Sequence, residues 1–163
     1  MLYLKYDLFH DLLKDMNFLV VTKNENTFLE DQSFYAGAIV PISQRKPHRD
    51  NSIQNGKWKI SVDEYRYSFY PPFINAGAYV MSQHTMKTMY LATHFVKKFP
   101  FDDVYYGIVA KKCGIKLFDS RNFWRIPRIL MGPDMKFTIA AHLKGERDQI
   151  ENIWKQQVKL GHA

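Results

Sequence analysis

The stretch Phe101-Asp102-Asp103-Val104-Tyr105-Tyr106-Gly107 places two adjacent carboxylates between an apolar approach and the start of a predicted helix. Carboxylates at such a junction lie near the positive end of the helix dipole and are positioned for acid–base chemistry. Aspartate is also a favoured helix-capping residue, so capping is the competing interpretation of both Asp102 and Asp103. Taken alone, the stretch favours capping.

Helical periodicity extends on both sides of this stretch. A helix from Asp102 to about residue 112 is predicted to bury Val104, Ile108 and Val109, and Gly114 supplies its left-handed stop. Ser82 is predicted to cap a preceding helix over about residues 83–98, which ends before Pro100.

The inward face of that preceding helix is predicted to carry its Met and aromatic residues, Met86, Met89 and Tyr90 among them, as core packing. Apolar residues at helical spacing predict two further helices, over about residues 7–17 and 147–158.

Short apolar runs between the helices predict strands. These runs cover residues 18–21, 34–40, 57–60, 77–81 and 116–118, and the run at 77–81 is expected to be buried. Strands that alternate with helices indicate an α/β layered domain. A chain of 163 residues is one domain's worth, so we expect a single domain over residues 1–163.

Composition excludes several classes of protein. A hydrophobic content of 46% with 15% aromatic residues excludes disorder. No apolar run reaches the roughly 18 residues of a membrane span, and the first residues show no signal-peptide pattern. The single cysteine, Cys113, excludes an intrachain disulfide and is expected to be a buried packing residue.

A net charge of +7 attracts nucleic acid, anionic lipid or the phosphates of a nucleotide sugar, and its sign does not choose among them. The most basic loop, residues 41–56, carries Arg45, Lys46, His48 and Arg49. A solvated loop is favoured over phosphate or acceptor contact, and no aromatic residue is interleaved there to stack bases. We expect no nucleic-acid partner, because no motif supports one.

A set of motifs in a fixed order connects the acidic stretch to the rest of the chain. Upstream of it stand Lys57-Trp58, Tyr65 and the run Tyr70-Pro71-Pro72-Phe73-Ile74-Asn75-Ala76-Gly77-Ala78-Tyr79-Val80-Met81-Ser82, and downstream stands Gly132-Pro133-Asp134. This order resembles the family 31 β-1,3-glycosyltransferases (galactosyltransferase family), and the style of its pieces is similar to the Brainiac-like β-1,3-N-acetylglucosaminyltransferases. The resemblance covers about residues 34–154.

The resemblance implies the carboxyl-terminal portion of a GT-A fold, a mixed sheet flanked by helices, in a single partial glycosyltransferase domain. The Rossmann-like half that holds the nucleotide in that fold is expected to be mostly missing. The implied activity is that of an inverting β-1,3-hexosyltransferase, which moves a sugar from UDP-N-acetylglucosamine or UDP-galactose to a glycan or glycolipid acceptor. The implied location is the Golgi membrane or lumen, where full-length relatives are membrane-anchored.

The resemblance also implies roles for individual residues. Asp103 matches the catalytic base, and Asp102 is its neighbour, a helix cap or a sugar ligand. The residues implied to bind substrate are Trp58, Tyr70, Pro72, Ala76, Gly77, Ala78, Tyr79, Tyr105 and Gly107. Core packing is the alternative for Trp58, a tight turn feeding a strand is the alternative for the Tyr70–Tyr79 run, and Gly107 is expected to permit close helix packing.

The metal site implied by the family combines a D-x-D strand with a histidine near the carboxyl end, and Mn²⁺ or another divalent cation is the implied cofactor. Ile139-Ala140-Ala141-His142 matches the second element, so His142 is a candidate metal ligand, with a structural histidine as the alternative. Leu4-Lys5-Tyr6-Asp7-Leu8-Phe9 resembles the D-x-D strand with two acids deleted, which leaves Asp7. We therefore expect weak donor binding and no sugar transfer by this chain alone, and the alternative function is an inactive glycan-binding remnant.

Overall fold

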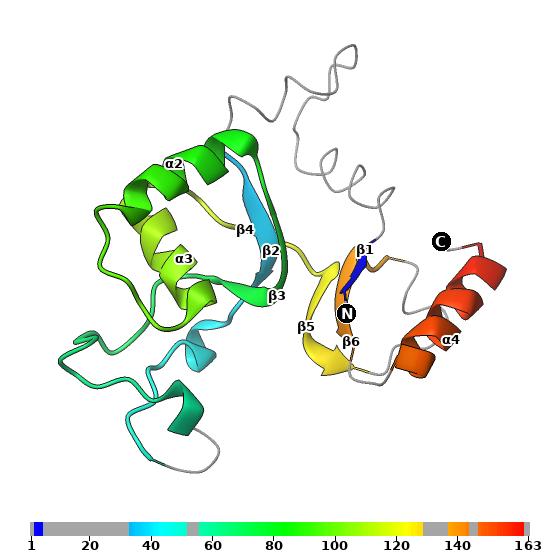
Figure 1. Ribbon diagram of the computed structural model, residues 1–163, viewed down its shortest axis with the longest axis horizontal. Coiled ribbons are helices and arrows are strands. Elements are labelled where there is room, and N and C mark those ends of the chain that lie inside the picture. The colour runs from blue at the N-terminus through cyan, green and yellow to red at the C-terminus, as the bar shows by residue number, and fades with distance from the viewer. Residues whose placement is uncertain (1, 5–32, 52–55, 129–136, 144–146, 162–163) are drawn as a thin grey trace.

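The computed structural model describes residues 2–4, 33–51, 56–128, 137–143 and 147–161. Six strands and three α-helices lie within these ranges (Figure 1). They are β1 (Leu2–Leu4), β2 (Tyr35–Ile39), β3 (Ile74–Met81), α2 (Gln83–Thr93), α3 (Asp102–Lys112), β4 (Phe118–Asp119), β5 (Phe123–Arg128), β6 (Ala140–Leu143) and α4 (Arg147–Lys159). The helix and strand predicted over residues 7–21 lie outside the described residues.

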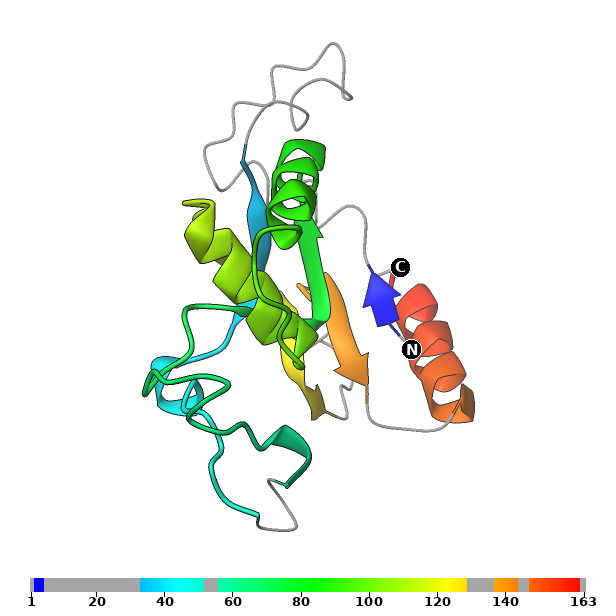
Figure 2. The same cartoon turned by 60° about the vertical axis from the view of Figure 1, so that its left-hand side comes forward.

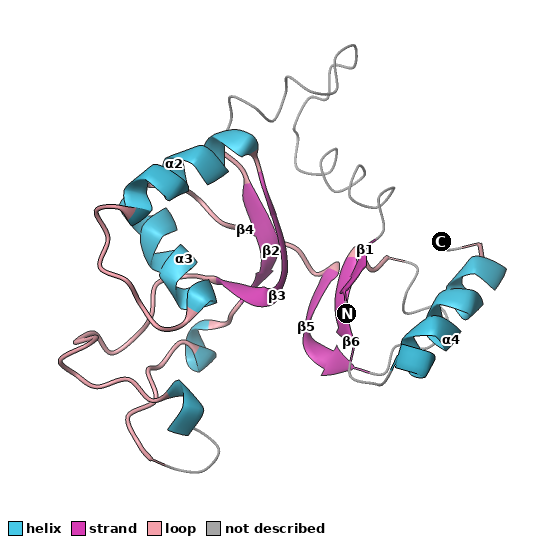
Figure 3. Ribbon diagram, viewed as in Figure 1, coloured by secondary structure: helices cyan, strands magenta, loops and turns pink. Residues whose placement is uncertain are grey.

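The strands form two small mixed sheets, where one mixed sheet was expected (Figure 3). In the first sheet β2 is central, antiparallel to β3 and parallel to β4. In the second sheet β6 is central, antiparallel to β1 and parallel to β5. The α/β class is thereby confirmed.

Small side chains join the two sheets. Ala38 of β2 belongs to a buried cluster with Phe123, Ile139 and Ala140, and Ala78 and Val80 of β3 pack against this cluster. The alanines of both sheets leave room for the larger Phe123 and Ile139, and the two sheets share this apolar layer.

Helices α2 and α3 cover the opposite face of the first sheet, as Figures 1 and 2 show. The core on this side includes Tyr35 and Ile74 from the strands, Met89 from α2 and Val109 from α3. Cys113 is partly buried and packs against this cluster, close to the packing role predicted for it.

Local signals place the helix ends. Ser82 is the N-cap of α2 as predicted, and its Oγ accepts from the backbone N–H of Thr85 at 3.1 Å. Helix α3 spans the predicted Asp102–Lys112, and Gly114 follows it with φ +69°. Helix α4 also matches its prediction to within a residue at its carboxyl end.

Three predictions about elements are wrong or incomplete. A strand was expected at residues 57–60, but Gly56–Trp58 forms a 3-10 turn. Among the described residues Lys59 pairs with His48 through a single isolated bridge, so no strand ladder forms there. Strand β3 is longer than expected and half-exposed, since it lies at a sheet edge. Helix α2 ends at Thr93, five residues early.

The early end of α2 contacts α3. The Tyr105 hydroxyl donates to the carbonyl oxygen of Thr93 at 3.4 Å and to that of Val96 at 3.3 Å, so α3 supplies a donor to the carbonyl groups where α2 ends. The inward stripe of α2 runs through Thr85 and Met89, so Met86 and Tyr90 are 52% and 62% exposed, contrary to prediction.

A membrane-spanning helix needs about 18 apolar residues or more, and none of the helices that the structure describes meets this requirement.

Candidate functional site

Asp103 lies half-buried in the first turn of α3, close to the start of β3. Its Oδ1 accepts from the backbone N–H of Val104 at 2.8 Å, and its carboxylate also accepts from the backbone N–H of Ala76. Burial raises the pKa of Asp103 above its ordinary value, and the charge of Asp102 adds to the increase, while these two backbone hydrogen bonds oppose it. The carboxylate is thus held in place and made more basic than a solvated aspartate.

The contact between α3 and the Pro71-Pro72 turn depends on Gly107. A Cβ atom added at Gly107 would lie 2.5 Å from the Cβ of Phe73 and 2.7 Å from the carbonyl oxygen of Pro72. The absence of a side chain therefore lets the helix approach this turn and brings Asp103, one helical turn earlier, to β3. The packing role predicted for Gly107 is confirmed.

Asp102 is exposed beside Asp103. The structure places the N-cap at Phe101, so Asp102 is the first helical residue and does not occupy the capping position that was one of the alternatives for it. Its Oδ1 accepts from the backbone N–H of Asp103 at 2.9 Å. Both acids therefore use side-chain oxygens to satisfy N–H groups of the first turn, which lack helical acceptors.

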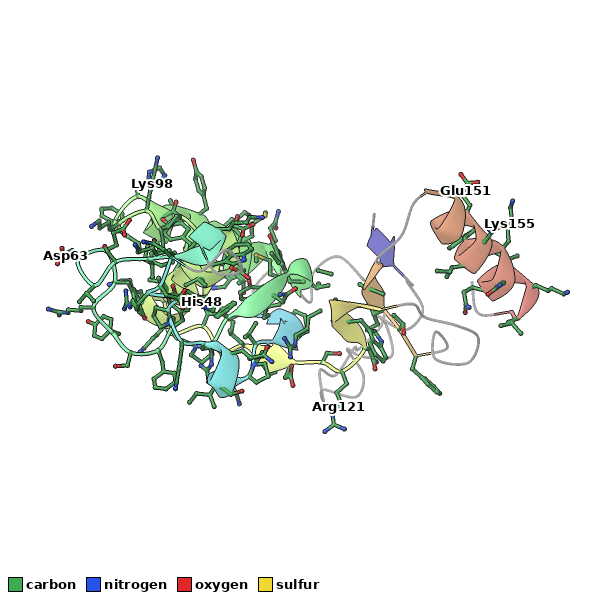
Figure 4. All side chains as sticks on the ribbon, turned by 90° about the horizontal axis from the view of Figure 1, so that it is seen from below. His48, Asp63, Lys98, Arg121, Glu151 and Lys155 are labelled. Carbon is green, nitrogen blue, oxygen red and sulfur yellow. The ribbon has the colours of Figure 1, made fainter. Side chains whose placement is uncertain are left out.

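A cavity of about 420 Å³ opens beside the Asp103 carboxylate. It is lined by polar and charged side chains from Gln44, Lys46, His48, Asn75, Arg125 and Asp103, and by Val40, Trp58, Tyr70, Phe73, Phe101 and Val104. Figure 4 shows His48 among the side chains gathered around the first sheet and its loops, far from the α4 helix with Glu151 and Lys155. We call this space the Asp103 cavity.

Tyr70 forms one wall of the Asp103 cavity and is 6% exposed. Its hydroxyl is buried and has no hydrogen-bond partner among the described residues. Burial raises the pKa of Tyr70 to about 12, against a lowering effect of Arg49. Because this hydroxyl is enclosed by protein atoms, Tyr70 lines the cavity with its ring.

Trp58 lies at the mouth of the same cavity and is 45% exposed. Its ring is 5.4 Å from that of Phe101, edge to face, and the Lys57 ammonium lies 4.7 Å from its centroid. An exposed indole beside polar groups suits the C–H surface of a sugar.

Several residues implied to bind substrate lie away from the Asp103 cavity. Tyr79 packs edge to face against Tyr35 and Tyr106, with ring centroids 5.6 and 6.1 Å away. Tyr105 is held by the end of α2, as described above. Four others are not among the residues that line the cavity, although the N–H of one of them, Ala76, bonds to the Asp103 carboxylate: Pro72, Ala76, Gly77 and Ala78.

The structure adds cationic and amide groups that sequence reasoning did not select. Arg125 of β5 reaches the cavity and donates to Gln44 Oε1 at 2.7 Å. Asn75 lines it from β3, and its Oδ1 accepts from the Gly77 N–H. Lys46 and His48 also line it, although the basic loop was interpreted as solvated.

One member of that basic loop has a structural role. The Arg49 guanidinium donates to the carbonyl oxygens of Ile60, Ser61, Tyr65 and Tyr67, at 2.5 to 3.3 Å. Four carbonyl contacts fix the loop that carries the aromatic residues to the loop that carries Lys46.

The candidate metal ligands are not tested by the structure. Asp7 lies outside the described residues, and His142 is described through its backbone position in β6, opposite Leu2, without its side chain. In the part of the chain that the structure describes, no three His, Cys, Asp or Glu residues gather into a group that could hold a metal ion. The described residues therefore do not form the implied cation site.

Comparison with known proteins gives a consistent result. A family model described as Galactosyltransferase matches residues 1–121. The chain is 32% identical over 160 residues to beta-1,3-galactosyltransferase brn of Drosophila melanogaster, covering 93% of this chain and 47% of that protein. It is 32% identical over 111 residues to N-acetyllactosaminide beta-1,3-N-acetylglucosaminyltransferase 4 of Mus musculus, covering 65% and 30%. It is also 32% identical over 115 residues to beta-1,3-galactosyltransferase bre-5 of Caenorhabditis elegans, covering 68% and 34%. The chain thus spans about half the length of these relatives, or less.

Proposed function

The chain belongs to the galactosyltransferase family, and from this membership we propose that it is an inverting β-1,3-hexosyltransferase. The proposed donor is UDP-N-acetylglucosamine or UDP-galactose, and the proposed acceptor is a glycan or a glycolipid. The proposed location is the Golgi membrane or lumen. The observation that carries the proposal is the Asp103 carboxylate, which is half-buried, more basic than usual and beside a cavity that suits a sugar.

The proposed chemistry is a single displacement. The acceptor hydroxyl oxygen forms a bond to the anomeric carbon of the donor sugar as the bond from that carbon to the diphosphate oxygen breaks. The Asp103 carboxylate takes the hydroxyl proton, and its raised pKa brings it closer to the pKa that an efficient general base needs near neutral pH. Positive side chains of Lys46 and Arg125 in the same cavity favour the negative charge of a diphosphate.

Sugar recognition is assigned to the aromatic and amide groups of the Asp103 cavity. Trp58 and Tyr70 offer ring surface, and the Asn75 amide offers hydrogen bonds to sugar hydroxyls. From the family we propose Mn²⁺ or another divalent cation as cofactor, with His142 and Asp7 as its ligands.

The experiment that tests the proposal is a transfer assay on the purified 163-residue chain. Radiolabelled UDP-N-acetylglucosamine and UDP-galactose are supplied with Mn²⁺ and with lactose or lactosylceramide as acceptor. Metal-dependent transfer above the level of the Asp103→Asn variant supports the enzyme. Acceptor binding without transfer, measured by calorimetry, supports the alternative of an inactive glycan-binding remnant for the chain as it stands.

Replacement of Tyr70 by Phe separates a ligand-binding hydroxyl from a structural one. The variant is expected to unfold at the same temperature or higher, because it removes a buried hydroxyl without a partner in the described structure. Its KM is expected to stay within about twofold, because the ring that lines the cavity is kept and the hydroxyl is enclosed. A KM raised about tenfold would show instead that the ligand bonds to this hydroxyl.

A further inference from the structure

A second cavity, of about 570 Å³, lies on the other side of Tyr70. It is enclosed by the loop that precedes β3 and by the carboxyl-terminal half of α3, and is lined by Tyr65, Tyr67, Phe69, Tyr70, Pro71, Pro72, Ile108, Lys111 and Lys112. Tyr70 is the residue that it shares with the Asp103 cavity. We call it the Lys111 cavity.

Aromatic rings dominate its walls. Tyr67 is 57% exposed and Phe69 is 41% exposed, so both present ring surface to solvent. The Tyr65 ring stands 5.4 Å from that of Tyr67, edge to face, and its hydroxyl donates to the Phe69 carbonyl oxygen at 2.9 Å, which fixes the loop. Exposed and oriented rings of this kind suit the C–H surface of a pyranose, since stacking costs little further ordering.

The rim is positively charged. Lys111 and Lys112 are exposed in the last turn of α3, and Arg66 stands beside Tyr67, to whose hydroxyl its guanidinium donates at 3.5 Å. This hydrogen bond and the Arg66 charge lower the pKa of Tyr67, and the charges of Lys112 and Lys111 lower it further. No Asp or Glu is among the residues that line the cavity. Lysines in the last turn of a helix also stabilise that helix. This structural role accounts for the two lysines but not for the aromatic rings that line the same cavity.

We propose that the Lys111 cavity binds an anionic saccharide, a sugar that carries a sulfate or a carboxylate. Its ring stacks on Tyr67 and Phe69, and its anionic group lies against the ammonium groups of Lys111 and Lys112. The assignment does not depend on sugar transfer, because Asp103, Lys46 and Arg125 do not line this cavity, and Tyr70 is the one residue that it shares with the Asp103 cavity.

Calorimetric or NMR titration of the 163-residue chain tests the assignment with four probes: lactose 3′-sulfate, lactose, inorganic sulfate and UDP. Lactose 3′-sulfate is expected to bind at least about tenfold more tightly than lactose or sulfate alone, since ring stacking and charge pairing act together. Equal affinity for sulfate would reduce the cavity to a simple anion site and overturn the saccharide. Tighter binding of UDP at these residues would assign it to a nucleotide.

Variants locate the site. The pair Lys111→Gln and Lys112→Gln is expected to weaken lactose 3′-sulfate about tenfold, and Tyr67→Ala is expected to weaken it separately. The matched control, Lys155→Gln with Lys159→Gln on α4, removes the same charge from another helix and is expected to change nothing. Equal losses in both lysine pairs would show attraction to net charge and overturn the proposal.

Two further controls complete the experiment. Asp103→Asn is expected to leave the affinity for lactose 3′-sulfate unchanged, which keeps the result separate from the transferase proposal. Circular dichroism melting confirms that each variant is folded.

Discussion

Replacement of Asp103 by Asn is expected to lower turnover by about 10²–10⁴-fold in any preparation of this protein that transfers sugar, the usual contribution of a general base. The amide retains an oxygen that can accept from the N–H groups of Val104 and Ala76, so the helix start is preserved. It cannot take a proton from the acceptor hydroxyl. The loss should therefore appear in kcat with little change in KM.

The same residue links activity to pH in a stated direction. The pKa of Asp103 is raised in the folded chain, so the base becomes active, as pH rises, above the range of a solvated aspartate. The contribution of Asp103 to stability changes with pH in the opposite direction. The folded state holds the Asp103 proton more tightly than the unfolded state does. The stabilisation is therefore present at low pH and is lost as pH rises through the raised pKa. Asp103→Asn should thus unfold at an equal or higher temperature at neutral pH.

Asp102→Asn is the matched control for both measurements. It removes an exposed carboxylate one residue away, whose charge raises the pKa of Asp103. Turnover should stay within about tenfold of that of the native chain, since Asp102 takes no proton. The acidic limb of the pH–activity profile should shift to lower pH, because the charge that raises the pKa of Asp103 is removed. Near-native turnover in Asp103→Asn would remove this residue from the mechanism and leave it a role at the helix start.

The helices were predictable because their signals are local. Ser82 caps α2 and Gly114 adopts φ +69° after α3, and each acts on residues within one turn. The end of α2 was not predictable, since its carbonyl groups bond to Tyr105 of another helix. Its buried face depends on the core that Met89 shares with the first sheet and α3. The 3-10 turn over Gly56–Trp58 similarly follows from a distant partner, as the Ile60 N–H donates to the His48 carbonyl oxygen.

The candidate site was predictable in part for a related reason. Motif order identified Asp103, Tyr70 and Trp58, which line one cavity. It did not show the irregularity in the pairing of β2 with β3, which lies between Ile74 and Tyr79 and breaks the simple alternation of faces. Asn75 therefore lines the cavity while Tyr79 packs against Tyr35. Arg125 comes from the second sheet, and nothing in its local sequence indicates where that sheet docks.

Replacement of Gly107 by Ala is expected to lower both stability and turnover. Two effects compete: alanine favours a helix over glycine by about 1 kcal/mol, and a well-packed site resists an added methyl group by about 1–3 kcal/mol or more. Here the added Cβ would lie 2.7 Å from a backbone carbonyl oxygen and 2.5 Å from a Cβ atom, and neither can rotate away. The clash should therefore outweigh the propensity.

The way the chain relieves this clash determines the effect on turnover. Helix α3 must move away from the Pro72-Phe73 backbone, and Asp103 moves with it because it lies one turn earlier on the same helix. A displacement of about 1 Å at a reacting group costs on the order of 10²-fold in rate. Gly56→Ala is the control, since a Cβ there meets nothing within 4 Å, and it should change neither the melting temperature nor turnover. A Gly107→Ala chain that melts at or above the native temperature would show that α3 does not need the close approach to position its carboxylate.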